Sequence, residues 1–228
     1  MKTVVAALAV CSLTTIAQAS TIATFSDTGT LSFSFTDIGS NNDGIGSLDA
    51  SNNDIEVILP SLGITFNDAS FTLTDSNGGS LETVSQTDVN GLIQAQFEGG
   101  ILSIVTDVDV AAAGLSAGDA ILTATFDSAF GLFGNLLSAD TFMGNNVSFG
   151  GFAVNGLPPL VAESFAFSAA NVTPGAALLA PADMEDWTAT VAFTSSAQAI
   201  PVPAALPLFI SALLGLFGPR QLRRRFAR

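Results

Sequence analysis

The chain of 228 residues is poor in the side chains that carry most protein chemistry. It contains no His and no Tyr, 1 Cys and 1 Trp, and only 6 Lys and Arg against 20 Asp and Glu. The single cysteine is Cys11, so the rest of the chain forms neither a disulfide nor a thiolate metal site. Ser-His-Asp triads, Cys-His pairs and zinc sites with the usual ligands are therefore excluded.

The charged residues are also unevenly distributed along the chain. The basic residues are Lys2 and the arginines from position 220 onward, whereas every acid lies between Asp27 and Asp186. Phosphate binding needs Lys and Arg, so we expect no nucleic acid partner. An anionic membrane surface is disfavoured for the same reason. Bound cations or a salty medium would relieve the repulsion among the acids.

The N-terminus has the pattern of a secretory signal peptide. A lysine follows the initial methionine, an apolar stretch comes next, and the small residues Ala17 and Ala19 precede Ser20 as signal peptidase requires. We expect the Sec translocon and signal peptidase to remove residues 1–19. A buried N-terminal helix or strand is one alternative. Lipid attachment at Cys11 is another, which the bulky residue before the cysteine disfavours.

A second apolar segment lies near the C-terminus. Residues 202–218 carry no charge, and as a helix they would span about 25 Å, near the lower limit for crossing a bilayer. The basic residues that follow are Arg220, Arg223, Arg224 and Arg225. They favour a transmembrane helix whose basic end stays in the cytoplasm, with everything before it outside. The alternative is a short apolar helix packed on the domain.

A proline-containing segment precedes this helix. It consists of Pro201, Val202, Pro203, Ala204 and Ala205. Prolines bias the residues before them toward extended backbone, which suits recognition by a protease. With the apolar run and the arginines, the segment resembles the VPLPA variant of the PEP-CTERM sorting signals of Gram-negative bacteria, over residues 201–228 only. Ile200 and Val202 depart from the commonest form, which has Val and Leu, and Gly218-Pro219 interrupts the run before the arginines.

This resemblance implies a sorting pathway and a setting for the protein. A membrane-embedded exosortase would recognise the proline-containing segment, cleave or transfer the protein there, and discard the helix and the basic tail. Proteins with such signals tend to accompany exopolysaccharide and biofilm production. The resemblance therefore implies an inner-membrane stage followed by the cell surface or the extracellular space.

Between the two ends, apolar residues alternate with polar ones. The alternation recurs at residues 31–35, 55–59, 69–73, 165–167 and 187–193, and it predicts half-buried strands. Asn-Gly pairs at 77–78, 90–91 and 155–156 predict tight hairpins. We expect an all-β domain over 20–196, an antiparallel β-sandwich or jelly-roll-like fold, followed by a linker and the sorting region over 197–228.

Three further local predictions follow from composition. Short helices are expected only around 111–117 and 130–137. The stretch 39–54 is rich in Gly, Asn, Ser and Asp, which predicts a surface loop. Trp187 lies on an alternating strand, so we expect it in the core rather than as a platform for sugars.

The only remaining chemistry belongs to carboxylates and hydroxyls. Calcium prefers such oxygen ligands, and the candidate ligands are Asp107 and Asp109 at a strand end and Asp43 in a polar loop. None of these matches an EF-hand pattern, and solvated acids on a strand face and an ordinary polar loop are the better explanation. Calcium is the one cofactor that the sequence suggests.

We expect the protein not to be an enzyme. A glycosidase needs only two carboxylates, and its candidates here would be Glu56, Glu82, Glu98 and Glu163, but no His or Arg is present between them to orient a substrate. The expected function is structural or interactive, at the cell surface or in the extracellular matrix, in association with exopolysaccharide. A calcium-dependent carbohydrate-binding module is the alternative.

Overall fold

The computed structural model describes the chain in pieces between Ala19 and Ala199. The described residues are 19–27, 33–37, 46–89, 92–134, 140–173, 178–179, 183–184 and 186–199. Residues 1–18 of the expected signal peptide, the sorting segment, the apolar run, the arginines and Asp43 lie outside these ranges. Ala19 and Ser20, on either side of the expected cleavage, lie within the first range, and residues 197–199 of the expected linker lie within the last. In the described part, no helix is long and apolar enough to cross a membrane.

The described residues form an antiparallel all-β fold, as predicted. Its strands are β1 (Ala19–Asp27), β2 (Phe33–Asp37), β3 (Gly46–Leu59), β4 (Ile64–Asp75), β5 (Leu81–Val89), β6 (Leu92–Phe97), β7 (Gly100–Thr106), β8 (Ala120–Phe126), β9 (Ser128–Gly134), β10 (Asp140–Asn145), β11 (Ser148–Gly150), β12 (Leu160–Thr173), β13 (Leu178–Leu179), β14 (Asp183–Met184) and β15 (Trp187–Ala199). One 3₁₀ turn, η1 (Phe152–Val154), follows β11.

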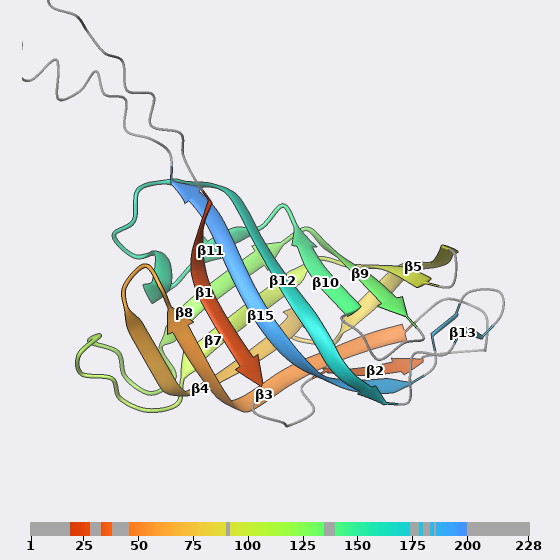
Figure 1. Ribbon diagram of the computed structural model, residues 1–228, viewed down its shortest axis with the longest axis horizontal. Coiled ribbons are helices and arrows are strands. Elements are labelled where there is room, and N and C mark those ends of the chain that lie inside the picture. The colour runs from red at the N-terminus through yellow and green to blue at the C-terminus, as the bar shows by residue number, and fades with distance from the viewer. Residues whose placement is uncertain are drawn as a thin grey trace, which may run out of the picture. The chain divides into compact units, whose positions relative to one another are not determined.

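Thirteen of these strands belong to one sheet, whose order is β1-β15-β12-β10-β9-β6-β5-β3-β4-β7-β8-β11, with β2 beside β15 and β3. One edge of the long strand β3 pairs with β1 and β2, and the other pairs with β4 and β5. Since β1 and β2 also pair with β15, the hydrogen-bond path returns to its starting strand. Figure 1 shows the result as two layers, with β1, β15 and β12 crossing in front of β4, β7 and β8.

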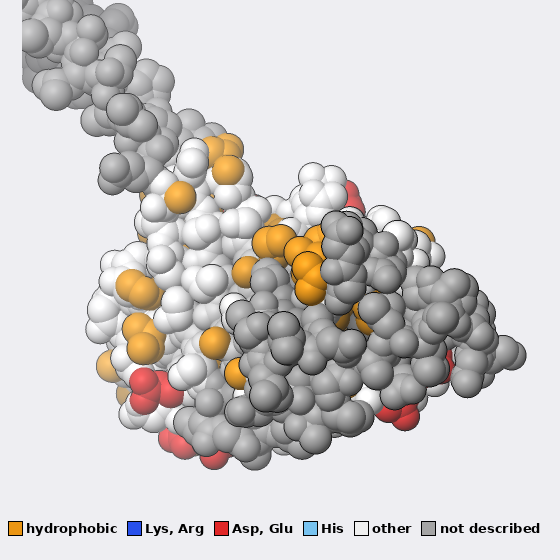
Figure 2. Space-filling view, turned by 45° about the vertical axis from the view of Figure 1, so that its right-hand side comes forward, with side chains coloured by type: hydrophobic (Ala, Val, Ile, Leu, Met, Phe, Trp, Pro, Cys, Tyr) orange, Lys and Arg blue, Asp and Glu red, His pale blue; other side chains and the backbone are white. Residues whose placement is uncertain are grey.

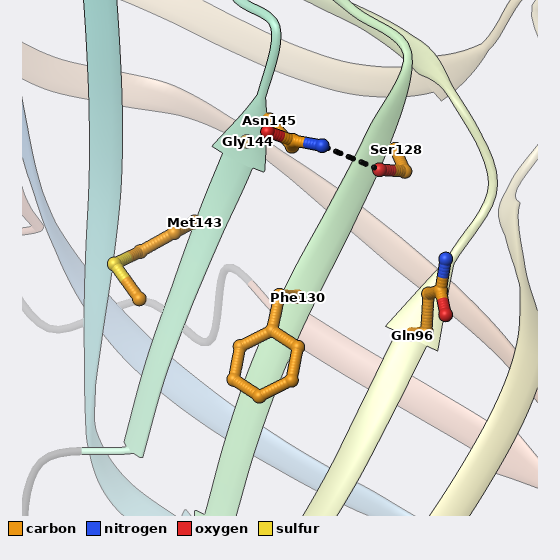
Figure 3. A pocket seen from close by; sticks show the side chains of 6 residues that line it. All are labelled: Gln96, Ser128, Phe130, Met143, Gly144 and Asn145. Carbon is orange, nitrogen blue, oxygen red and sulfur yellow. Dashed lines mark hydrogen bonds between the residues drawn. The ribbon is translucent and has the colours of Figure 1, made fainter.

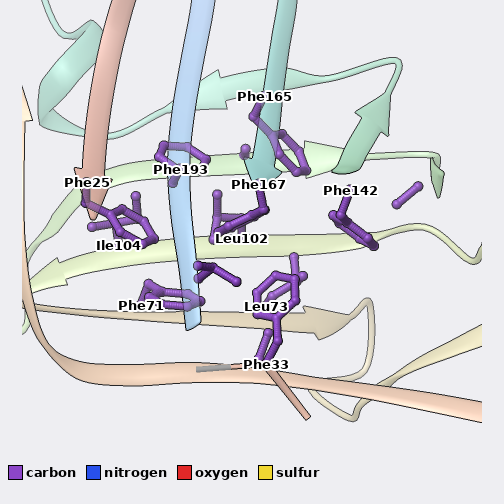
Figure 4. Close-up of a cluster of buried hydrophobic side chains, with 14 of the residues drawn as sticks. Phe25, Phe33, Phe71, Leu73, Leu102, Ile104, Phe142, Phe165, Phe167 and Phe193 are labelled. Carbon is purple, nitrogen blue, oxygen red and sulfur yellow. The ribbon is translucent and has the colours of Figure 1, made fainter. Parts of the chain in front are cut away.

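Phenylalanine rings fill the space between the layers. Phe25 of β1 lies 4.9 Å from Phe71 of β4 between ring centroids, and Phe167 of β12 lies 5.8 Å from Phe71. Figure 4 shows these rings between strands of both layers. Most of the longer strands contribute about every second residue to this core, because successive side chains of a strand point to opposite faces. The alternation of β15 is one example, with six buried positions from Trp187 to Ala197.

Trp187 is a core residue, as predicted. It is 1% exposed, stacks on Phe35 of β2 at 6.0 Å, and packs against Phe133 of β9 at 5.2 Å. The chain's only tryptophan therefore joins β15, β2 and β9 and is not on the surface to stack with a sugar.

Both helix predictions are wrong over the residues that the structure describes; residues 135–137 of the second lie outside them. Residues 111–114 form turns between β7 and β8, closed by a bridge from Val110 to Leu115. Residues 128–134 form β9, in which Ala129 and Phe133 face the core. Glycine at 131 fits this strand because the Phe133 ring occupies the space where a Cβ would lie. Tertiary packing here outweighs local propensity.

The predicted loop over 39–54 is wrong from Gly46 onward, because β3 begins there. Leu48 and Ala50 are buried while Asp49 and Ser51 are exposed, so the stretch alternates although most of its residues are small or polar. The ring of Phe35 on β2 covers Gly46 where a side chain would otherwise lie. An aromatic ring from a neighbouring strand commonly compensates for a glycine in this way.

The Asn-Gly pairs mark turns, and one marks a hairpin. β5 and β6 pair with each other up to Val89 and Leu92, on either side of residues 90–91. Gly78 has φ +86° in the turn after β4, and Gly156 has φ +80° in the turn after η1. Neither of these two turns connects two strands that are hydrogen-bonded to each other, so neither closes a tight hairpin.

Candidate functional site

Six strands that are consecutive in the sheet carry few acids. We call β6, β9, β10, β12, β15 and β1 the neutral layer, since they are consecutive in the sheet. Their only acids are Asp27 and Asp140 at strand ends and Glu163 near an irregularity at the start of β12. Their outward side chains are mainly Ser, Thr, Ala, Gln and Asn.

The acids of the described part lie mostly elsewhere. They are on β2, β3, β4, β5 and β14 and on the connections around the other strands: Asp37, Asp49, Asp54, Glu56, Asp68, Asp75, Glu82, Asp88, Glu98, Asp107, Asp109, Asp119, Asp127, Asp183 and Asp186. Those whose burial is described are exposed or half-buried. Figure 2 shows acidic side chains mostly near the lower edge of this face, with a few more at its upper right, and hydrophobic side chains in several places between them. Most of the acids thus lie outside the six strands of the neutral layer. Asp127 lies at its border, because it directly precedes β9 and its amide donates to the Asn145 carbonyl of β10 at 3.1 Å.

Strand register aligns outward side chains across the neutral layer. One row runs from β5 across the layer to β1 through directly paired residues: Ser85, Gln96, Phe130, Met143, Ala166, Thr194 and Thr24. At a strand spacing of about 4.8 Å, this uncharged row is about 29 Å long.

A hollow of about 390 Å³ lies on this row. It is lined by Gln96, Ser128, Phe130, Met143, Gly144 and Asn145, which come from β6, β9 and β10. In Figure 3 the Phe130 ring lies between Met143 and Gln96, and Asn145 Nδ2 donates a hydrogen bond to Ser128 Oγ at 3.5 Å. No lining residue is charged, so the hollow offers amide, hydroxyl, aromatic and thioether groups only.

The glycosidase candidates do not converge on this hollow. Glu82 and Glu98 lie together, because the Glu98 amide donates to the Glu82 carbonyl and the Glu82 amide donates to Glu98 Oε1, each at 3.1 Å. Glu56 pairs with Ser26 of β1, and Glu163 is on β12. The Glu98 carboxylate is thus engaged by backbone.

The calcium candidates Asp107 and Asp109 lie in the connection between β7 and β8, where their carboxylates accept hydrogen bonds from other groups of the protein. Asp107 Oδ1 accepts from Ser70 Oγ at 2.8 Å, and Asp109 Oδ1 accepts from the Ala117 amide at 2.9 Å. Among the described residues, no three His, Cys, Asp or Glu side chains are grouped to hold a metal ion.

Asp75, at the end of β4, has a lowered pKa. The Gly79 amide donates to Asp75 Oδ1 at 2.6 Å, and the backbone and side-chain nitrogens of Asn77 donate at 2.8 and 3.3 Å. Hydrogen bonds to the ionised form stabilise it, so they lower the pKa of Asp75 below 3.8, the Gly79 bond most of all. This carboxylate closes the turn that holds Gly78.

The sequence predictions missed the hollow, although part of its signal is visible. Residues 92–97 alternate apolar residues with two glutamines, which indicates an uncharged polar face. Because Phe130 falls in the helix expected over 130–137, its place on the same face was not predicted. Among known proteins, no family model, no curated protein and no solved structure matches the chain.

Proposed function

We propose that this chain is an exported protein of the cell surface or extracellular matrix of a Gram-negative bacterium, with an interaction role and no catalytic one. The observation that carries the proposal is the neutral layer on a chain of net charge −14. Burying an unpaired carboxylate at an interface is costly. Binding of a partner at the neutral layer therefore buries fewer carboxylates, and costs less in desolvation, than binding at the strands that carry the acids.

The ends of the domain support the export part of the proposal. Ala19 of β1 pairs with Gln198 of β15, and Ser20 pairs with Ala197. Figure 1 shows these two strands side by side. Cleavage by signal peptidase before Ser20 would leave β1 almost whole. The exosortase-type segment begins at Pro201, two residues after β15 ends. Both processing steps would thus occur at the same end of the sandwich, and residues 202–218 would form the transient membrane helix.

The experiment is mass spectrometry of the protein recovered from cells and medium of the native host. We expect a chain that starts at Ser20, ends within 201–205 and is found at the surface or outside the cell. A variant with Pro201 and Pro203 both changed to alanine is expected to keep its basic tail and remain with the membranes. A wild-type chain that retains residues 220–228 would show that no sorting takes place.

A further inference from the structure

We propose that the hollow at Phe130 binds a segment of an uncharged polysaccharide. The inference deepens the proposed function and rests on it, since it names the partner of an exported domain. Its first support is the hollow's chemistry. Gln96 and Asn145 each carry a donor and an acceptor, and Ser128 carries a hydroxyl. Such groups match sugar hydroxyls, which also both donate and accept.

The second support is the aromatic ring. Phe130 is half-buried and faces outward between Gln96 and Met143, its paired neighbours on β6 and β10 (Figure 3). The polar rim and the apolar ring thus occupy one concave site, as in small-ligand sites generally. A sugar ring has an apolar face of C–H groups and an edge of hydroxyls, and this site offers a surface for each.

The charge distribution selects an uncharged ligand. The sequence has no Lys or Arg between residues 3 and 219, so the domain has no cation to pair with a uronate or sulfate group. Its acids repel polyanions as they approach. A polycation would bind the acids themselves, and none of them belongs to the row of paired outward side chains on which the hollow lies.

The length of the row favours a chain over a small molecule. The uncharged row of paired side chains continues from the hollow through Ala166 and Thr194 to Thr24. A second copy of this protein fits less well. The apolar side chains at the hollow are Phe130 and its paired neighbour Met143, and Gln96, Ser128 and Asn145 line it beside them, whereas the centre of a homodimer interface is mostly apolar.

The test is titration calorimetry on the full chain, purified in a sugar-free detergent so that no detergent headgroup competes. The probes are cellohexaose, laminarihexaose and maltohexaose, with polygalacturonate as the anionic comparison. We expect at least one neutral hexasaccharide to bind. Phe130→Ala and Phe130→Leu should each weaken that binding about tenfold, because stacking of this size is about 1.4 kcal/mol. Phe130→Leu keeps an apolar side chain and guards against a folding defect.

Thr72→Ala is the matched control, since Thr72 is exposed on β4 in the other layer. It should bind like the wild type. The proposal is overturned if all three neutral probes fail, if polygalacturonate binds as tightly, or if both Phe130 variants bind normally. A dimer by light scattering that Phe130→Ala dissociates would assign the face to a second copy instead. Failure of the sorting proposal would show separately, in the masses of the chain ends.

Discussion

The Phe167→Ala substitution tests whether one aromatic cluster holds the two layers together. Phe167 is 0% exposed. Its ring neighbours come from five other strands of the sheet and one position on its own strand: Phe25, Phe33, Phe71, Phe142, Phe193 and Phe165, with centroids between 5.0 and 6.2 Å away. Removing a buried phenylalanine ring costs about 3–5 kcal/mol. Because this one ring packs against all of these neighbours, we expect about 4–5 kcal/mol.

Urea unfolding followed by the fluorescence of Trp187 measures this cost. Trp187 packs against Phe35 and Phe133, so its emission reports unfolding without direct influence from position 167. Phe130→Ala removes the same ring from the outer face and is expected to cost about 1 kcal/mol. Phe167→Leu should cost under about 1.5 kcal/mol. Equal losses for Phe167→Ala and Phe130→Ala would refute the reasoning.

The remaining predictions concern packing, protonation and salt. Gly144→Ala places a Cβ against the ring of Phe165 and should lower the free energy of unfolding by about 1–3 kcal/mol. A Cβ at Gly79 would meet no atom nearer than 3.5 Å, so Gly79→Ala should change the free energy of unfolding by under about 0.5 kcal/mol. Similar melting temperatures for the two variants would contradict this expectation. The lowered pKa of Asp75 stabilises the folded state at pH values above 3.8, and this contribution is lost as pH falls through the lowered pKa. An NMR titration should place that pKa below 3.8, and Asp75→Asn should lose stability at neutral pH but little in strong acid. Sodium chloride should raise the melting temperature by screening the acids. Calcium and magnesium chlorides at equal ionic strength should then act alike, and an extra rise with calcium alone would support the calcium-dependent alternative.

The fold class was predictable because the alternating pattern is local. In β15 every second residue from Trp187 is buried, and the pattern is visible without knowing any partner strand. The wrong predictions concern segments of small residues. Residues 128–134 contain two glycines and an alanine, and they become a strand only because β6 and β10 flank them.

The hollow was not predictable from the sequence because it depends on register. Gln96, Phe130 and Met143 are far apart in the chain and meet only where β6, β9 and β10 align. The same holds for the neutral layer, whose strands are scattered from β1 to β15 along the chain. Local patterns indicate which face of a strand a residue occupies, whereas strand pairing decides which residues of that face are neighbours.

The pairing of Ala19 with Gln198 also has a consequence for engineering. The chain enters and leaves the domain on two adjacent strands, so a short linker can join residue 199 to residue 19. The exposed turn over 111–114 between β7 and β8 then offers new chain ends, and exposed turns of this kind commonly accept them. For the same reason the domain is suited to insertion into a surface loop of another protein. The two loop residues that flank the insertion then need to be only about 5 Å apart, which is the distance between neighbouring strands.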